Sequence, residues 1–274
     1  MENPVPNIQH SITILVTGAN GQLGQTMEEL FARNHINLEF VFVSKEMLDI
    51  TKKGEVKSFF KANKFDYCIN CAAYTNVEQA EKTPDIAYKV NAEAVKNLAE
   101  ICKKHNTVLI HISTDYVFDG EKKEPYEVTD LTNPINEYGK SKLQGEQHIQ
   151  NILEKYFIIR TSWLYSKKYA KNFYKAIVAK AQTEKELTVT TEQIGCPTNT
   201  VNLSAFINKI VETNNTNYGI YHFCDEKAMT WYDFAKHILI ENNLLKKIKL
   251  VKSDKYLTFA KRPTNSVLIN TKLS

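Results

Sequence analysis

Continuous apolar runs and helically spaced apolar positions alternate through roughly the first 160 residues. Short runs rich in β-branched residues predict strands at 12–17, 38–43, 67–72, 107–112 and 156–161. Apolar residues recurring every three or four positions predict helices at 22–33, 54–62, 84–104 and 137–154. Strands without polar alternation are typical of sheets covered on both faces. The pattern therefore predicts an α/β protein with a Rossmann-type, doubly wound parallel sheet and right-handed crossovers.

Beyond residue 162 the alternation becomes less regular. Strands are expected at 187–191 and 218–223, and helices at 200–211 and 230–241. We predict that residues 1–162 form a dinucleotide-binding Rossmann domain and that 163–274 form mainly a smaller, C-terminal substrate-binding lobe, with later elements returning to the sheet. Such a lobe would lie over the carboxyl ends of the strands, where open α/β sheets bind ligands.

The composition excludes several classes of protein. The 274 residues carry a net charge of only +4, from 35 basic and 31 acidic residues, which predicts no nucleic-acid partner. No apolar run approaches the roughly 18–20 residues that a membrane helix needs. The first residues lack the basic and apolar blocks of a signal peptide. We therefore expect a cytoplasmic protein without a membrane partner.

Cys68 and Cys71 have the Cys-x-x-Cys spacing of many zinc and redox sites. They fall within a predicted strand, where positions i and i+3 face opposite sides of the sheet. We therefore expect buried thiols and no metal site.

Gly18, Gly21 and Gly24 directly follow the first predicted strand. Their spacing differs from G-x-G-x-x-G but meets the same needs, namely a tight turn, close approach to a pyrophosphate and close helix–strand packing. The amides of Gln22 and Leu23 would open a helix whose positive end faces the phosphates. A glycine-rich turn without a ligand is the alternative.

The second predicted strand ends at Ser44 and Lys45, where fingerprints of this kind often have an acid for the ribose hydroxyl. A hydroxyl and a cation could instead hold a ribose 2′-phosphate, which favours NADPH and still allows NADH; a merely solvated Lys45 is the alternative. Other residues expected along the cofactor are Asp49 and Ile50, near the adenine, and Ala73, Tyr74 and Thr75, at the end of the third strand.

Tyr138 and Lys142 lie four residues apart and would share one face of a predicted helix. A free tyrosine, with a pKa near 10, is a poor acid or base at pH 7. We expect the Lys142 ammonium to lower the tyrosine pKa by favouring the phenolate. Thr114, or Ser113, could polarise a substrate carbonyl. Such Tyr/Lys pairs also occur by chance, but after a glycine loop and a strand-end hydroxyl they predict hydride transfer at a carbonyl, with Tyr138 as proton donor.

Several stretches together resemble the extended short-chain dehydrogenase/reductases, and within them the dTDP-4-dehydrorhamnose reductases. The matching stretches are 18–24, 70–75, 113–118, 138–142, 160–163, 193–198, 230–235 and 261–266. The resemblance covers nearly the whole chain, from about residue 12 to residue 273.

The resemblance implies that Thr114, Tyr138 and Lys142 form the catalytic set. It implies NADPH or NADH as cofactor, held by Gly21, Gln22, Leu23, Asp49, Ile50, Ala73, Tyr74 and Thr75. It implies a dTDP-sugar substrate contacted by Thr114, Asp115, Tyr138 and Trp163, with Pro197, Thr198 and Arg262 as further candidates. The expected reaction is reduction of dTDP-4-dehydro-L-rhamnose to dTDP-L-rhamnose, a precursor of cell-surface polysaccharide. A homodimer is compatible with the resemblance.

Alternative functions remain open within and beyond this superfamily. Dehydratases carry an Asp-Glu pair after the threonine, and here Tyr116 follows Asp115, which counts against dehydration and less against epimerisation. Reduction of another 4-keto nucleotide sugar is a further alternative. A non-catalytic, nucleotide-binding regulatory subunit is disfavoured by the intact Tyr138 and Lys142.

Overall fold

The computed structural model describes residues 11–31, 37–225, 227–254 and 257–273. Its main sheet has six parallel strands in the order β2-β1-β3-β4-β5-β10. These strands are β1 (Ile12–Thr17), β2 (Leu38–Val43), β3 (Tyr67–Asn70), β4 (Val108–Thr114), β5 (Tyr156–Thr161) and β10 (Gly219–His222). The chain moves outward in opposite directions from β1 and β3, so a ligand cleft is expected at their carboxyl ends.

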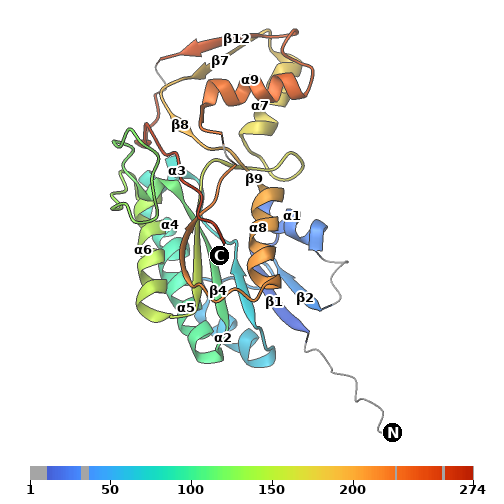
Figure 1. Ribbon diagram of the computed structural model, residues 1–274, viewed down its shortest axis with the longest axis vertical. Helices are drawn as coiled ribbons and strands as arrows, with labels where there is room; N and C mark the ends of the chain where they lie inside the picture. Colours follow the sequence, from blue (N-terminus) through green and yellow to red (C-terminus); the bar gives the residue numbers. More distant parts are fainter. Residues whose placement is uncertain (1–10, 32–36, 226, 255–256, 274) are drawn as a thin grey trace.

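Helices cover both faces of this sheet, as the continuously apolar strands predict (Figure 1). One face packs against α2 (Lys53–Ala62), α5 (Ala94–His105) and α6 (Glu137–Ile152). The other packs against α1 (Gln22–Phe31) and α8 (Thr200–Glu212). The predicted Rossmann-type doubly wound sheet is confirmed.

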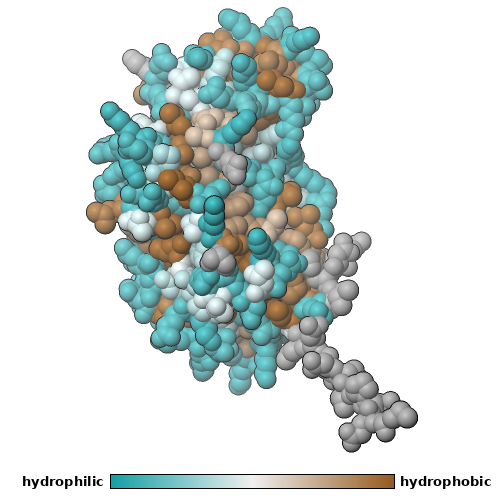
Figure 2. Space-filling model, viewed as in Figure 1, coloured by the Kyte–Doolittle hydropathy of each residue, from teal (hydrophilic) through white to brown (hydrophobic). Residues whose placement is uncertain are grey.

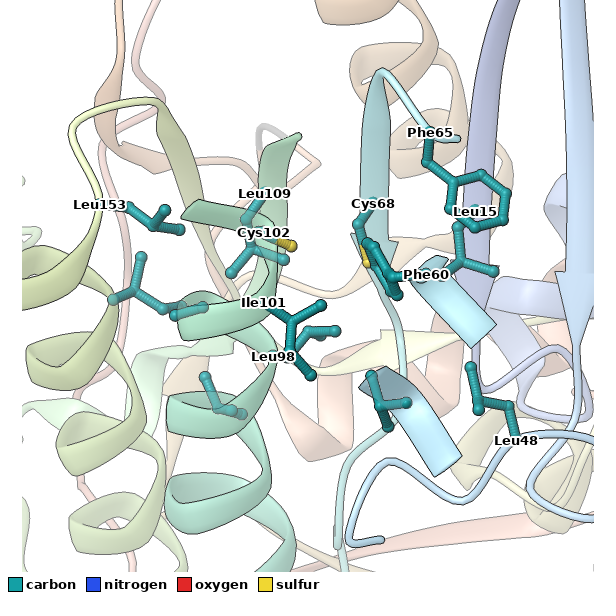
Figure 3. Packing of buried hydrophobic residues seen from close by; sticks show 14 of the residues in the cluster. Leu15, Leu48, Phe60, Phe65, Cys68, Leu98, Ile101, Cys102, Leu109 and Leu153 are labelled. Atoms are coloured by element: carbon teal, nitrogen blue, oxygen red, sulfur yellow. The ribbon is translucent and has the colours of Figure 1, made fainter. Parts of the chain in front are cut away.

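Alternate strand residues supply the two cores. Leu15, Cys68 and Leu109 point into the first core with Phe60 from α2, and Figure 3 shows this packing. Cys71 instead packs against the second core. The two thiols therefore face opposite sides of the sheet, as predicted, and all five cysteines are free. No group of three His, Cys, Asp or Glu side chains suited to a metal ion occurs within the described ranges.

The predicted helix at 84–104 is interrupted by a wider turn. It consists of α4 (Pro84–Tyr88), a π-helical turn (Lys89–Glu93) and α5. Single π turns inside helices often serve functional sites. Just before it lies α3 (Val77–Lys82), which the apolar pattern does not predict because it is short and mostly polar.

The lobe has a separate hydrophobic cluster under a two-stranded parallel sheet. The sheet pairs β7 (Glu186–Thr190) with β12 (Lys249–Ser253), and the helices are α7 (Phe173–Thr183) and α9 (Trp231–Glu241). Figure 1 shows these four elements grouped beyond one end of the main sheet. α7 and β12 are further elements that the pattern missed, since lysines interrupt both apolar runs.

Short strand pairs join the lobe to the sheet domain. β6 (Leu164–Tyr165) pairs with β9 (Thr198–Asn199), and β8 (Ile194–Gly195) pairs with β11 (Met229–Thr230).

On the face shown in Figure 2, hydrophobic side chains are interspersed with hydrophilic ones. Across the part of the chain that the structure describes, no helix combines the length and apolar character needed to span a membrane.

Candidate active site

The glycine loop links β1 to α1 in a shape that side chains would disrupt. Gly18 has φ +70°, and a Cβ there would lie 2.7 Å from the backbone nitrogen of Ala72, at the end of β3. Glycine is therefore required for this close approach. α1 begins at Gln22, and its first turn contains no acidic residue. Its free amides and positive end are thus available to an anion such as a pyrophosphate.

Gln22 also connects the loop to the start of the lobe. Its Nε2 donates to the carbonyl oxygen of Leu164 at 2.9 Å, and its Oε1 accepts from the Ser166 amide at 3.1 Å. These two hydrogen bonds hold the glycine loop at a fixed distance from the start of the lobe, on the other side of the cleft.

Two adjoining cavities, of about 450 and 390 Å³, open at the carboxyl ends of the strands. Both are lined by Gly21, Cys71 and Ala73. The larger one, the reaction cavity, is also lined by the predicted residues Gln22, Leu23, Gly24, Thr75, Thr114, Asp115, Tyr138, Lys142, Trp163 and Arg262. The smaller one, the adenosine-side cavity, is also lined by Gly18, Lys45, Asp49, Ile50 and Tyr74. Most of the predicted site residues therefore meet along one continuous cleft.

An acid lies beside the predicted phosphate-binding pair. Glu46 lines the adenosine-side cavity next to Lys45. Its Oε2 accepts from Ser44 Oγ at 2.7 Å and from Asn20 Nδ2 at 3.2 Å. Ser44 does not line the cavity, because its hydroxyl is directed at this carboxylate. Glu46 was not predicted as a site residue, because it lies two positions beyond Ser44, the strand-end position at which such fingerprints often carry an acid.

The π-helical turn fixes the wall of the adenosine-side cavity. Asn91, within that turn, accepts from the Tyr74 amide at 2.8 Å and donates to the Tyr74 carbonyl at 3.0 Å. Its Nδ2 also lies 3.0 Å from Ser141 Oγ on α6. One buried side chain therefore sets the distance between the chain after β3 and the helix that carries Tyr138.

α6 carries Tyr138 in its first turn and Lys142 one turn later. Asn136 begins the helix by accepting from the Gly139 amide at 2.8 Å, and its Nδ2 donates to the Lys261 carbonyl at 2.9 Å. Tyr138 and Thr114 line the same cavity, and the Thr114 hydroxyl acts to lower the pKa of Tyr138. Burial raises the pKa of Tyr138 well above its ordinary value, so this tyrosine stays protonated at neutral pH.

The Lys142 ammonium points toward β4 rather than toward the phenol. Its Nζ donates to the Ile112 carbonyl oxygen at 2.6 Å and lies 3.2 Å from His111 Nε2. Burial lowers the pKa of Lys142 to about 8, against the opposing influence of Glu146 and Cys71. The expectation that Lys142 lowers the Tyr138 pKa does not hold for this geometry, because burial of the phenol raises that pKa and the lysine charge is not among the groups that shift it.

Of the two strand-end hydroxyls, Thr114 is the one available to a ligand. Ser113 Oγ donates to the buried Glu146 carboxylate, which also pairs with Arg160 at 2.7 Å. Thr114 Oγ1 lies 3.0 Å from Asp115 Oδ1 and accepts from the Tyr116 amide at 3.1 Å. Burial raises the pKa of Asp115 to about 6, although hydrogen bonds from Ser266, Ser162 and Thr114 oppose this shift.

Two stacked indoles form the lobe side of the reaction cavity. Trp163 and Trp231 lie parallel, with ring centroids 3.6 Å apart, and both line the cavity. A Cβ at Gly195 would lie 2.5 Å from the Trp163 ring, so glycine is needed there. The predicted residues Pro197 and Thr198 are buried and do not line either cavity, and Thr198 Oγ1 donates to the Ser162 carbonyl at 2.7 Å. Trp231 is a further cavity residue that was not predicted from the sequence.

Arg262 reaches the cavity from the C-terminal segment. Its Nη2 pairs with Glu78 Oε1 at 2.8 Å, and its Nη1 donates to Tyr116 Oη at 3.3 Å. The buried Nε has no hydrogen-bond partner among the described residues. Glu78 therefore holds at the cavity a cationic side chain whose buried Nε–H is unused.

The parallel sheet, the glycine loop at its switch point and the Tyr/Lys helix define a Rossmann-type protein with the architecture of the short-chain dehydrogenase/reductases. The chain belongs to the RmlD substrate binding domain family, whose profile matches residues 12–274.

Individual relatives agree with this assignment. The chain is 40% identical over 270 residues to the dTDP-4-dehydrorhamnose reductase of Aggregatibacter actinomycetemcomitans, covering 95% of this chain and 91% of the relative. It is 35% identical over 223 residues to a dTDP-4-keto-6-deoxy-D-glucose reductase of Streptomyces niveus, covering 81% of this chain and 76% of the relative. A crystal structure of the Bacillus anthracis dTDP-4-dehydrorhamnose reductase in complex with NADP superposes with a TM-score of 0.90 at 37% identity, covering 95% and 91% of the two chains.

Proposed function

We propose that this protein reduces the 4-keto group of a dTDP-4-dehydro-6-deoxyhexose, with dTDP-4-dehydro-L-rhamnose as substrate and dTDP-L-rhamnose as product. The observation that carries the proposal is the meeting of Thr114, Tyr138 and Lys142 in one cavity that continues past the glycine loop. The names of the relatives supply the substrate class. The predicted cytoplasmic location and homodimer remain predictions.

The cleft suits a nicotinamide dinucleotide along its length. The acid-free N-terminus of α1 would hold the pyrophosphate, the adenosine-side cavity would take the adenosine, and Lys142 would bond the nicotinamide ribose. When bound, NADPH or NADH supplies the hydride that is delivered to C4 of the sugar.

The chain's own residues would handle the oxygen at C4. Tyr138 keeps its proton at neutral pH and gives it to the alkoxide, which is a stronger base than a phenolate. Thr114, whose hydroxyl donates to Asp115 in this structure, would turn to donate a hydrogen bond to the same oxygen as charge develops. Arg262 and the Trp163–Trp231 stack would bind the nucleotide part of the substrate, through charge and through apolar surface respectively.

A direct assay tests the proposed reaction. Purified protein with NADPH should oxidise the cofactor, followed as loss of absorbance at about 340 nm, when dTDP-4-dehydro-L-rhamnose is added, and the product should be dTDP-L-rhamnose. Turnover only with a different 4-keto sugar nucleotide would favour the second candidate, which the Streptomyces niveus relative suggests. Cofactor binding without turnover of any keto sugar would contradict the enzymatic proposal and favour a regulatory subunit.

We expect Lys45 and Glu46 to have opposite effects on cofactor choice. Lys45→Ala should lower the NADPH/NADH ratio of kcat/KM, because a cation that favours a 2′-phosphate is lost. Glu46→Gln should raise the ratio, because a carboxylate that repels the phosphate and favours a ribose hydroxyl is lost. Each change should be modest, roughly three- to tenfold, since both side chains face solvent.

Lys53→Ala serves as the control for this pair of variants. Lys53 is exposed and pairs with Glu100, away from the cleft, so its loss should leave the ratio unchanged. An unchanged ratio in both Lys45→Ala and Glu46→Gln would show that neither residue contacts the adenosine ribose.

We expect kcat/KM for NADPH to fall as the pH rises through about 8. Burial lowers the Lys142 pKa to about 8, so the charged ammonium predominates below this pH and is lost above it. Tyr138 keeps its proton across the same range because burial raises its pKa. The profile of kcat/KM reports groups of the free enzyme. A flat profile up to about pH 9.5 would mean that the charge on Lys142 is not needed.

A further inference from the structure

A buried chain of polar side chains extends from Lys142 to the strand that precedes the glycine loop. Lys142 Nζ lies 3.2 Å from His111 Nε2, and His111 Nδ1 lies 3.0 Å from Asn70 Nδ2. Asn70 Oδ1 accepts from Thr17 Oγ1 at 2.7 Å. All four residues are almost fully buried, with 0–1% exposure. The chain crosses the sheet from β4 through β3 to the last residue of β1.

The contacts of Lys142 determine where its remaining donor points. A charged lysine has three N–H donors. The Ile112 carbonyl takes one at 2.6 Å, and His111 Nε2, 3.2 Å away, takes a second when Nε2 carries the lone pair rather than the hydrogen. Since Lys142 lines the reaction cavity, the third is left for a ligand there. Two fixed partners therefore orient the ammonium.

His111 is suited to this task because it remains neutral. Burial and the nearby Lys142 charge hold the pKa of His111 well below its usual range. A neutral imidazole has one donor nitrogen and one acceptor nitrogen. With Asn70 Nδ2 at His111 Nδ1, Nδ1 is the acceptor and Nε2 carries the hydrogen, which suits a neutral Lys142 amine. With the Asn70 amide reversed, Nδ1 donates to Asn70 Oδ1, Thr17 Oγ1 accepts from Asn70 Nδ2, and Nε2 presents a lone pair to the Lys142 ammonium. The chain can thus match either protonation state of the lysine.

We propose that His111 is a positioning residue, which together with the Ile112 carbonyl aims Lys142 at the nicotinamide ribose and ties it, through Asn70 and Thr17, to the base of the cofactor loop. This inference rests on the proposed function. It gives a role to a histidine that stands in an otherwise apolar stretch of β4.

Two amide substitutions separate positioning from simple packing. In His111→Gln the terminal amide reaches about the place of Nε2 and can still contact Lys142. In His111→Asn the shorter side chain reaches only the place of Nδ1 and Asn70. We expect His111→Gln to keep kcat within about threefold of the parent and His111→Asn to lose about 10–100-fold, as small misplacements of catalytic groups do.

Binding and isotope measurements identify the cause of that loss. His111→Asn should raise the Kd for NADPH, measured by fluorescence titration, and should raise the kinetic isotope effect with 4-deuterated NADPH. Thermal unfolding of both variants is measured alongside, and similar melting temperatures are expected. Equal kinetics and equal NADPH affinity in the Gln and Asn variants would overturn the proposal.

A measurement on the parent protein covers the case in which both variants fail to fold. With ¹⁵N-labelled histidine, adding NADPH should shift the His111 Nε2 resonance, because a ligand on the third N–H repolarises the other bonds of the lysine. An unmoved resonance with NADPH bound would overturn the positioning role. If the parent binds NADPH but reduces no keto sugar, the proposed function fails. The difference in NADPH Kd between His111→Gln and His111→Asn, and the shift of the His111 Nε2 resonance, still test the role of His111.

Discussion

Tyr138→Phe should lower turnover by about 10²–10⁴, the usual contribution of a positioned general acid. The substitution removes only the hydroxyl, so the ring contact with Tyr116, at 5.8 Å between centroids, should persist. Fold and NADPH affinity should therefore survive. Steady-state kcat with the 4-keto sugar nucleotide, together with a thermal melt and an NADPH titration, measures all three effects.

Tyr156→Phe is the matched control for this experiment. Tyr156 lies at the start of β5 and packs against the first core, far along the strand from the cleft end, so its hydroxyl should not affect turnover. A Tyr138→Phe protein whose kcat was within threefold of that of the parent would contradict the proposed mechanism. The alternative of a regulatory subunit would then be favoured.

Lys142→Met should damage both turnover and cofactor binding. Lys142 is almost fully buried, and methionine fills most of the same volume. A loss of turnover or of NADPH affinity is then caused by removal of the ammonium and not by a new cavity. A charged hydrogen bond to the ribose is worth about 1.5–3 kcal/mol, which corresponds to roughly a 10–100-fold rise in the Kd for NADPH. We expect kcat to fall by a further factor of about 10², because the group that orients the cofactor beside the substrate is lost.

Lys140→Ala on the same helix is the control, since that lysine is exposed and pairs with Glu137. Lys140→Ala should leave both kcat and the Kd for NADPH nearly unchanged. If Lys142→Met bound NADPH as tightly as the parent, the ribose contact would be wrong even if turnover fell. Thr114→Val, which removes one hydrogen-bond donor, should lower kcat less than either Tyr138→Phe or Lys142→Met.

The sheet was predictable because its signal is local and repeated. Each strand of the main sheet is a continuous apolar run, and each flanking helix has a helical apolar period, so element type and order follow from burial on two faces. The lobe was harder to predict, since α7 and β12 are short elements whose apolar sides pack against α9 and β7 in a separate cluster. Their pairing partners lie far away in the sequence, and no local pattern identifies them.

Residues that carry the chemistry could be recognised in the sequence wherever a single element sets their spacing. Gly18 to Gly24 follow one strand, and Tyr138 and Lys142 share one helix face. The solvation of these groups and the neighbours they contact depend instead on how distant elements pack together. Burial raises the Tyr138 pKa where the sequence predicted a lowering, and Lys142 turns to His111 and Ile112. Trp231 and His111 come to the cleft or its support through packing between separate elements, because contacts across a sheet or between lobes leave no mark in the spacing along one segment.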